Sequence, residues 1–460
     1  MIGREDQALD ATAPLREQAG APGATRRCDV LVIGGGPAGS TIAALLAQRG
    51  FDVVVVEKDR HPRFHIGESL LPMNVPLFEQ LGVDREIARI GMVKRAAELN
   101  SPHHAAPVNF DFSQAWDKRF PYAYQVRRSE FDQILFEHCV RRGATGLQAC
   151  RVTEVRFAGD AVQVEARNHD GTAQRFEAGF LVDASGRDTF LAGKLGLKQR
   201  NPRHASAALF GHFRHARRLP GEAEGNISLF WFEHGWFWFI PLRDRTTSVG
   251  AVCWPHYLRT RRTDPTRFLL DTIALCPALA ARLEHAELIG PATATGNYSY
   301  LGRRMTGERH ILIGDAFAFV DPVFSSGVFL AMNSAFLGAD VVEATLRGRP
   351  DAGRVRRRFE REVRYGLRQF SWFIYRMTSP AMRRLFMAPR NALRMQEALL
   401  SLLAGDLFRG TPIHWSLRAF KAVYYLSALA DLKDNLSAWR RRRSMMRTAL
   451  ADPAELPPAG

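Results

Sequence analysis

A strand, a glycine-rich turn, a helix and a second strand follow one another between Asp29 and Glu57. Gly34, Gly36 and Gly39 stand at GxGxxG spacing in the turn between the first strand and the helix. This spacing permits a tight turn, lets backbone N–H groups approach a pyrophosphate, and lets the helix pack closely on the sheet. The helix N-terminus favours an anion, and Glu57 is placed to accept hydrogen bonds from a ribose diol. The stretch therefore predicts a dinucleotide site, but it does not separate NAD from FAD.

The length of 460 residues exceeds what one core usually holds, so we expect two interlocked domains plus an appendage. The five cysteines are scattered, without CxxC or Cys/His metal spacing, which predicts neither a disulfide framework nor a metal site. No apolar run approaches the roughly 20 residues of a membrane helix, and no signal peptide opens the chain. We therefore expect a cytoplasmic protein without a transmembrane segment, whose redox chemistry comes from a bound cofactor.

The net charge of +16 belongs mainly to the end of the chain. From Val341 onward the sequence has 23 Lys and Arg against 10 Asp and Glu. We find no nucleic-acid-binding signature there, only amphipathic helical patterns, so nucleic acid is not expected as a partner. An acidic protein partner or a peripheral contact with an anionic membrane fits better. The alternative is a solvated arginine-rich face with no partner.

The order of segments predicts interleaved domains. Ser129 and Asp132 have the spacing of a helix capping box, and Asp170-Gly171 is typical of a turn between strands. The expected elements are a disordered leader (1–27), a loop (63–72), helices (73–90), a strand meander (151–180), an aromatic-rich sheet (206–254), a long helix (328–346) and a helical tail (354–447).

Three separated segments together resemble the glutathione-reductase-type FAD domain of the aromatic hydroxylase class. They are the glycine turn, the run from Asp183 to Arg187, and the Gly314-Asp315 pair before a second helix N-terminus. The resemblance favours FAD over NAD. It implies that Asp315 holds the sugar alcohol of the flavin, that Arg128 contacts the pyrophosphate, and that the segment from Asp183 lines the cofactor.

Two further motifs resemble the flavin-dependent halogenases. The run from Trp236 to Pro241 matches the WxWxIP signature of that family, and the run from Gly67 to Pro72 matches the GES loop of its non-tryptophan branch. In the family the two indoles, here Trp236 and Trp238, keep the substrate from reaching the flavin directly. The alternative is a pair of core aromatics, since a period of two places both on one strand face. Both interpretations can hold together.

One departure concerns the substrate. Tryptophan halogenases carry Glu before the serine of their flavin-edge loop, whereas Phe324 precedes Ser325 here. The pattern resembles instead the halogenases that act on phenols, pyrroles and carrier-bound aromatic acyl groups. The resemblance implies that reduced FAD, oxygen and chloride or bromide give hypohalous acid, and that a separate flavin reductase supplies the reduced FAD.

The halide is expected at the loop formed by Ser325, Ser326 and Gly327, where a helix begins and offers backbone N–H groups. The alternative is that Ser325 or Ser326 only caps the helix. Hypohalous acid must then meet the substrate in a protected place, where a lysine can hydrogen-bond it or be N-halogenated. Lys94 lies about where the family places its essential lysine, and the alternative is an ordinary surface charge. The chain has only seven lysines against 56 arginines, so an amine at this position stands out.

Two sets of residues are expected to form the site. Lys94, Trp236 and Trp238 are expected to be catalytic. The residues expected to bind FAD are Gly34, Gly36, Pro37, Ala38, Gly39, Glu57, Lys58, Gly67, Glu68, Ser69, Arg128, Asp183, Gly314, Asp315, Pro322 and Gly327.

The expected fold is α/β (α+β), with a Rossmann FAD-binding domain interleaved with a mainly antiparallel β-sheet substrate domain and followed by a helical C-terminal region. The expected division is FAD domain (28–105, 122–200 and 297–348), substrate domain (106–121 and 201–296) and basic tail (349–460). The expected function is halogenation of an electron-rich aromatic, free or carrier-bound, in secondary metabolism. An NADPH-using aromatic hydroxylase and a flavin-bearing scaffold protein are the alternatives.

Overall fold

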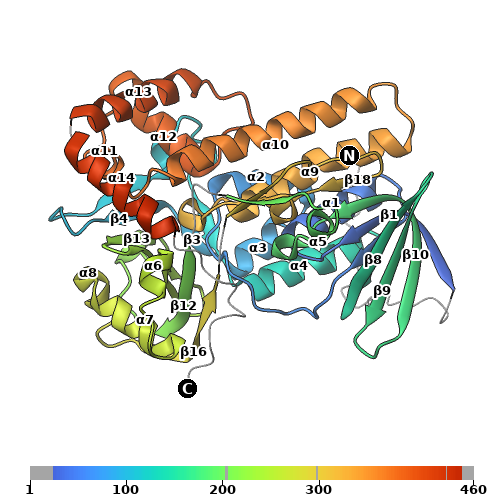
Figure 1. Cartoon of the computed structure of the whole chain (residues 1–460), viewed down its shortest axis with the longest axis horizontal. Helices are drawn as coiled ribbons and strands as arrows, with labels where there is room; N and C mark the ends of the chain where they lie inside the picture. Colours follow the sequence, from blue (N-terminus) through green and yellow to red (C-terminus); the bar gives the residue numbers. More distant parts are fainter. Residues whose placement is uncertain (1–23, 202–205, 297–298, 431, 448–460) are drawn as a thin grey trace, which may run out of the picture.

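The computed structural model describes residues 24–201, 206–296, 299–430 and 432–447. The expected disordered leader lies outside the described residues except for its last few positions, and Thr25 already begins the first strand. Figure 1 shows a sheet with strands β8 to β10 on the right, a second sheet at the lower left and a cluster of helices at the upper left.

The first sheet has seven strands in the order β7-β2-β1-β10-β9-β8, with β18 also paired to β10. Its strands are β1 (Thr25–Ile33), β2 (Val53–Val56), β7 (Thr145–Leu147), β8 (Cys150–Ala158), β9 (Ala161–Asn168), β10 (Ala173–Asp183) and β18 (His310–Leu312). Strands β7, β2, β1, β10 and β18 are parallel. Strand β2 is four buried valines, as expected when helices cover both faces of a parallel sheet.

Helices α1 (Pro37–Gln48), α4 (Arg128–Arg141) and α9 (Gly327–Leu346) pack with this sheet. Gly39 explains why α1 can lie so close, because a Cβ there would stand 1.9 Å from the carbonyl oxygen of Gly34. The short helices are α2 (Val75–Leu81), α3 (Asp84–Ile90), α5 (Phe190–Lys194), α6 (Pro255–Leu258), α7 (Pro265–Ala274) and α8 (Pro277–Ala280). The expected helices between residues 73 and 90 are therefore confirmed, as is the meander formed by β8, β9 and β10.

The second sheet also has seven strands, in the order β16-β12-β15-β14-β13-β4-β5. They are β4 (Ala96–Asn100), β5 (Val108–Asp111), β12 (Ala207–Arg214), β13 (Ile227–Phe232), β14 (Gly235–Pro241), β15 (Thr247–Cys253) and β16 (Glu287–Thr295). All its pairings are antiparallel except that of β13 with β4. Alternate residues of β14 face opposite sides. Trp236 and Trp238 belong to the main core, and Phe237 and Phe239 to a second core with α7.

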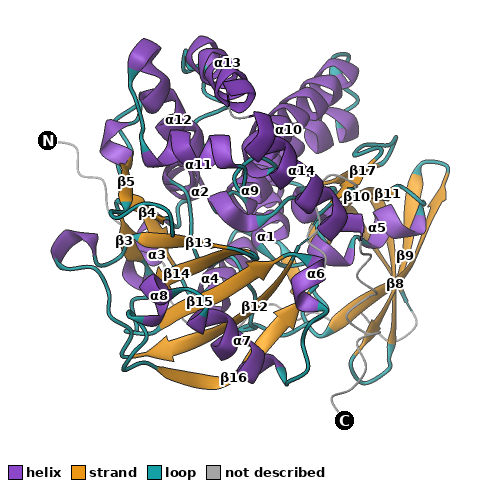
Figure 2. Cartoon of the chain, turned by 60° about the vertical axis from the view of Figure 1, so that its left-hand side comes forward, coloured by secondary structure: helices purple, strands orange, loops and turns teal. Residues whose placement is uncertain are grey.

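Three small pairings and a helical tail complete the chain. Strand β3 (Met92–Lys94) pairs with β6 (Ala123–Gln125), and β11 (Lys198–Arg200), β17 (Tyr300–Gly302) and β19 (Ala318–Phe319) form a three-stranded sheet. The tail contains α10 (Ala352–Ile374), α11 (Pro380–Met387), α12 (Met395–Ala404), α13 (His414–Ala430) and α14 (Leu432–Arg447). Figure 2 shows α14 beside α6, so the tail returns to the second sheet. The predicted fold class is thus confirmed.

Three details differ from the expectations. The chain enters the second sheet at Ala96, before the expected boundary at residue 105, because β4 pairs with β13. The capping box is wrong: α4 begins at Arg128, and Asp132 forms ion pairs with arginines instead of capping it. Helix α9 is long and apolar enough to cross a membrane by length and composition, contrary to our expectation, yet it packs against α1 and α10 inside the protein.

Candidate functional site

A cavity of about 500 Å³ lies where the first sheet, the loop 63–72 and the second sheet meet. The glycine turn and the end of β2 form one wall, and residues 184–188 and 313–328 form another. Trp236 and Trp238 reach it from the second sheet. Segments that are far apart in the sequence therefore converge on one site, as the three motifs predicted. Its volume is typical of small-molecule sites.

The glycine turn has the geometry that a dinucleotide requires. Gly34 adopts a φ of 99°, and a Cβ there would lie 2.5 Å from the carbonyl oxygen of Ala184. The Glu57 carboxylate accepts a hydrogen bond from the backbone N–H of Gly35 at 2.7 Å, which fixes the acid beside the turn. Helix α1 begins at Pro37 without a side-chain cap, so its first N–H groups stay available at the cavity wall.

Two arginines stand beside this turn and share one buried acid. Arg63 lies 3.2 Å from Asp132 and 3.5 Å from Glu57, and Arg128 donates to Asp132 at 2.8 Å. Asp132 is fully buried, and the neighbouring guanidinium groups outweigh the effect of burial and hold its pKa below the usual range. Arg128 was a predicted site residue, whereas Arg63 was named only as the start of its loop.

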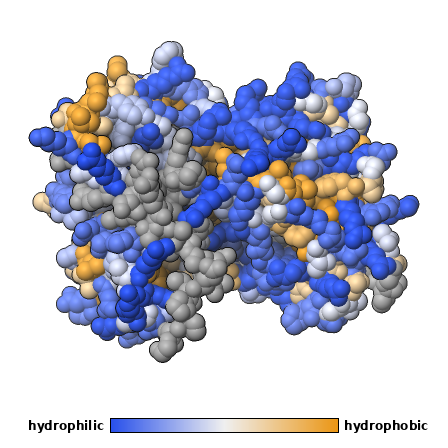
Figure 3. Space-filling model, viewed as in Figure 1, coloured by the Kyte–Doolittle hydropathy of each residue, from blue (hydrophilic) through white to orange (hydrophobic). Residues whose placement is uncertain are grey.

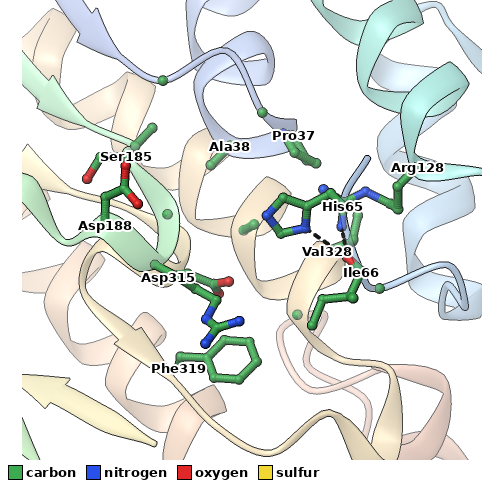
Figure 4. Close-up of a pocket in the computed structure, with 18 of the residues that line it drawn as sticks. Pro37, Ala38, His65, Ile66, Arg128, Ser185, Asp188, Asp315, Phe319 and Val328 are labelled. Carbon is green, nitrogen blue, oxygen red and sulfur yellow. Dashed lines mark hydrogen bonds between the residues drawn. The ribbon is translucent and has the colours of Figure 1, made fainter. Parts of the chain in front are cut away.

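The residues present fit FAD. The Nε–H of Arg63 is buried and has no hydrogen-bond partner among the described residues, at a cavity wall where an anion could accept it. Figure 4 shows Asp315 lying toward the cavity opposite His65, and its side chain makes no hydrogen bond within the described part of the chain. Burial raises the pKa of Asp315 to about 7 and lowers that of His65 to about 4. A carboxyl group among such neighbours is suited to sugar hydroxyls.

Lys94 is buried beside the cavity, although it does not line it. Its Nζ atom donates to the Oγ atom of Ser69 at 3.0 Å and to the carbonyl oxygen of Leu70 at 2.6 Å. It also lies 5.3 Å from the ring centre of Phe112. No ion pair to Lys94 occurs within the described ranges, and burial lowers its pKa to about 7. Such a lysine can be either ammonium or amine near neutral pH.

The GES loop is tied to the second sheet and to the small sheet formed by β3 and β6. Ser69 bridges to Gln125 of β6, and the Oε1 atom of Glu68 lies 2.8 Å from the Nε2 atom of His212 on β12. Strand β6 in turn pairs with β3, so Lys94 and the loop are held by the same small sheet. His212 was not found from the sequence, because no motif or spacing distinguishes it from other strand residues.

The two tryptophans lie on one face of β14, 6.1 Å apart between ring centroids. The Nε1–H of Trp238 donates to the Oγ atom of Ser248 at 3.1 Å. Gly250 makes room for this indole, since a Cβ there would lie 2.2 Å from the ring. Both indoles are buried in the main core and also line the cavity, so the core interpretation is confirmed and the shielding role stays a prediction.

The loop before α9 carries the expected halide residues. Ser325 has a left-handed backbone with a φ of 56°, and Gly327 begins the helix. Ser326 occupies the N-cap position of α9, as the helix-cap interpretation expects, but no side-chain hydrogen bond caps the helix. Ser325 and Gly327 line the cavity, whereas Ser326 is buried behind it.

Most of the predicted cofactor residues line the cavity: Gly34, Gly36, Pro37, Ala38, Glu57, Lys58, Gly67, Glu68, Ser69, Arg128, Asp315, Pro322 and Gly327. Gly39, Asp183 and Gly314 do not, and each has a structural role. The Asp183 carboxylate accepts the backbone N–H of Leu191 at 2.8 Å and that of Ser185 at 2.9 Å. Arg63, Phe64, His65, Ser185, Arg187, Phe210 and Phe319 line the cavity but were not in the predicted set.

Comparison with known proteins agrees with this geometry. Residues 27–358 match the FAD binding domain family. The chain is 32% identical over 398 residues to the flavin-dependent halogenase gsfI of Penicillium aethiopicum, covering 80% of this chain and 72% of the relative. It is 34% identical over 330 residues to a tryptophan 2-halogenase of Chondromyces crocatus, covering 70% of this chain and 62% of the relative.

Two further similarities bear on substrate and fold. The chain is 29% identical over 409 residues to the 1H-pyrrole-2-carbonyl-[peptidyl-carrier protein] chlorinase of Pseudomonas fluorescens, covering 83% of this chain and 90% of the relative. The solved structure of the myxobacterial chondrochloren halogenase CndH superposes with a TM-score of 0.74 at 33% identity, covering 88% of this chain and 97% of that one.

Proposed function

This chain belongs to the flavin-dependent halogenases within the FAD binding domain family, and we propose that it halogenates an electron-rich aromatic ring, phenolic or pyrrole-type, in secondary metabolism. The observation that carries the proposal is the buried Lys94 bonded to Ser69 of the cavity wall. A lysine ammonium without a carboxylate partner is costly to bury, so its place beside a flavin cavity calls for a function.

When bound, FAD supplies the reducing equivalents with which oxygen and a halide give hypohalous acid. The glycine turn, Arg63 and Arg128 would hold its pyrophosphate, and Asp315 its sugar alcohol. Backbone N–H groups of Ser325 to Gly327 would hold chloride or bromide. Trp236 and Trp238 would exclude the substrate from the flavin side. These roles follow from positive charge, N–H donors and indole packing at the cavity wall.

Lys94 would take up hypohalous acid behind Ser69, either by a hydrogen bond from its ammonium or by forming an N–halogen bond as an amine. In the first case the ammonium donates a proton to the departing hydroxide while the ring attacks the halogen. In the second the amine attacks the halogen, the O–halogen bond breaks and water leaves; the halogen then passes from nitrogen to the ring carbon, and the ring proton returns the nitrogen to an amine. A pKa of about 7 makes both forms accessible at neutral pH.

The partners follow from this chemistry. A separate flavin reductase would supply reduced FAD, and the substrate would be a free aromatic molecule or an aromatic acyl group on an acidic carrier protein. The basic tail is suited to an acidic carrier protein. We favour a carrier over peripheral membrane contact because the pyrrole chlorinase of Pseudomonas fluorescens is named for a carrier-bound substrate. All five cysteines are free thiols, in keeping with a cytoplasmic enzyme.

The test is a product assay with purified protein, FAD, a flavin reductase with NADH, oxygen and bromide, against phenols and pyrroles both free and carrier-bound. Mass spectrometry should show bromine in place of hydrogen. The hydroxylase alternative predicts instead an added oxygen with NADPH alone as reductant. A protein that binds FAD but gives neither product with any of the panel would favour the scaffold alternative.

A further inference from the structure

A second cavity, here called the C-terminal cavity, lies between the second sheet and the helical tail. Its volume is about 1590 Å³, and its walls come from residues 100–107, the β13–β14 hairpin, α8, and the tail from residue 375 to residue 439. None of the site residues discussed above lines it. It is larger than most small-molecule sites require. Nothing in the halogenase chemistry proposed above accounts for it.

Its position connects it to the flavin cavity. Trp231 of β13 lines the C-terminal cavity, and Trp236 of β14 lines the flavin cavity. The two residues are directly opposite each other in the hairpin, so their side chains share one face. One cross-strand pair of indoles therefore stands between the two cavities on this face of the sheet.

Helix α11 makes a second connection. Phe386 packs 5.4 Å from Phe110 and 6.5 Å from Phe324, the residue before the halide loop. Arg383, three positions earlier, lines the C-terminal cavity. Three residues of helix rise about 4.5 Å. Arg383 is thus about one helical turn from Phe386, whose ring packs on Phe324 next to the halide loop.

The lining is aromatic and apolar. Phe230, Trp231, Phe232 and Trp254 come from the second sheet and the segment after it, and Tyr375, Tyr424 and Tyr425 from the tail. Leu429, Leu432 and Trp439 also line it and are 64%, 57% and 52% exposed. Figure 3 shows apolar side chains gathered at the upper left, where Figure 1 places the tail helices. Large exposed apolar side chains on a rim commonly mark binding surfaces.

Two arginines belong to this lining, and neither has a carboxylate partner among the described residues. Arg376 lies 4.4 Å from the ring centre of Trp372 and donates to the hydroxyl of Tyr425 at 3.1 Å. The Nε–H of Arg383 is buried and has no partner within the described residues. Neither guanidinium forms an ion pair in the described part of the chain, and the one carboxylate of the lining, Glu233, contacts neither.

An unpaired, partly desolvated guanidinium in an aromatic cavity is stabilised by an anion that enters with it. Burial lowers the pKa of Arg383, which reflects this cost. Guanidinium groups bind carboxylates and phosphates with paired N–H donors, and aromatic walls accept a flat ring. A neutral phenol would gain less from the two charges, because it has no anion to pair with them.

We propose that the C-terminal cavity binds an aromatic ligand that carries a negative charge, and that Arg376 and Arg383 hold that charge. The inference rests on the proposed halogenase function in one respect: if the ligand of the C-terminal cavity is the substrate of the halogenase, that substrate is an anionic aromatic and not a neutral one. The anion is either the carboxylate of a free aromatic acid or the phosphodiester of a carrier arm that bears an aromatic acyl group. The cavity and its two arginines are the same for both sources.

Binding is tested first, on the FAD-loaded full chain, so that the flavin cavity is filled. Isothermal titration with 2-naphthoate and with neutral 2-naphthamide compares the same rings with and without the charge. We expect tighter binding of the acid. Arg383→Gln should weaken 2-naphthoate roughly tenfold to a hundredfold and leave 2-naphthamide unchanged, and Arg383→Lys should restore part of the loss. Arg390→Gln, at an exposed position outside the lining, is the matched control.

Turnover separates the two sources of the anion. Arg383→Gln should raise KM without changing kcat. If the bound anion is a carboxylate, the rise appears with 4-hydroxybenzoate; if it is the phosphodiester of a carrier arm, the rise appears with carrier-bound 4-hydroxybenzoyl. 4-Hydroxybenzamide should be unaffected. Naphthoate binding that depends on Arg383 in a protein that halogenates nothing would leave this inference standing and overturn the proposed function. Equal affinity for acid and amide, or an acid affinity indifferent to Arg383→Gln, would overturn the inference itself.

Discussion

The Nζ atom of Lys94 donates a hydrogen bond to the Oγ atom of Ser69 at 3.0 Å, which joins strand β3 to the loop that lines the flavin cavity. The lysine is fully buried, and its other hydrogen-bond partner in the described chain is the carbonyl oxygen of Leu70. Both partners are neutral acceptors. The amine is therefore positioned by the cofactor loop but not neutralised by it.

Replacing Lys94 by Ala should abolish halogenated product while FAD stays bound. The glycine turn and the arginines beside it are separate from the lysine, so the flavin spectrum of the purified variant should match that of the wild type. Hypohalite or peroxide should accumulate in solution, measured by a colorimetric trap. The exposed Lys118, changed to Ala, is the control. A Lys94→Ala enzyme with wild-type product yield would show that another group delivers the halogen.

The same lysine should make stability depend on pH. Burial lowers its pKa from 10.5 to about 7, so between these values the unfolded chain binds more protons than the folded chain. The free energy of unfolding should therefore rise as pH rises from about 7 toward 10.5, by at most about 1.4 kcal/mol per pH unit from this group. Urea unfolding measures this free energy for the wild type and for Lys94→Met. The free energy of unfolding of the variant should exceed that of the wild type by more at pH 7 than at pH 10. A difference independent of pH would contradict the lowered pKa.

Arg63→Gln should weaken FAD binding by roughly tenfold to a hundredfold, since it removes a charged donor at the glycine turn. The guanidinium lies between Glu57 and Asp132, so the variant also leaves these acids less well neutralised beside a pyrophosphate. Fluorescence titration of the apoprotein with FAD measures the change. Arg60→Gln, at an exposed position three residues earlier, should bind FAD as the wild type does. An unchanged affinity in Arg63→Gln would remove the arginine from the FAD site.

Gly250→Ala should displace Trp238 and lower halogenated product. A Cβ at this position would lie 2.2 Å from the indole, which packs across β15 and bonds to Ser248. Overpacking of this kind costs about 1–3 kcal/mol, visible as a lower Tm. If the indole excludes substrate from the flavin, peroxide release per flavin oxidised should also rise. Gly193→Ala, where nothing lies within 4 Å, is the control and should change neither.

Local sequence was sufficient for the parts of the site whose chemistry requires particular residues at fixed spacing. Gly34 and Gly39 were predictable because the turn needs a positive φ and a close helix, and the structure shows both. Asp315 and the two tryptophans were expected from the resemblance to the FAD domain and to the halogenases, and all three line the cavity. Asp183 shows what the motif alone leaves open: the segment after it lines the cavity, whereas its own carboxylate accepts the backbone N–H groups of Ser185 and Leu191.

The fold class, the location of the flavin cavity and the unusual lysine could be predicted from short stretches of chain, because glycine spacing, strand periodicity and indole motifs are local patterns. Which distant groups meet depends on tertiary packing. Arg63 contacts Asp132, 69 residues later in the chain, where Arg128 also binds the same carboxylate. His212 contacts Glu68, 144 residues earlier. No periodicity records such contacts, since they depend on how two sheets and a helical tail pack. The same packing leaves Arg383 facing an aromatic cavity without an acid, a property of the assembled walls and not of any one segment.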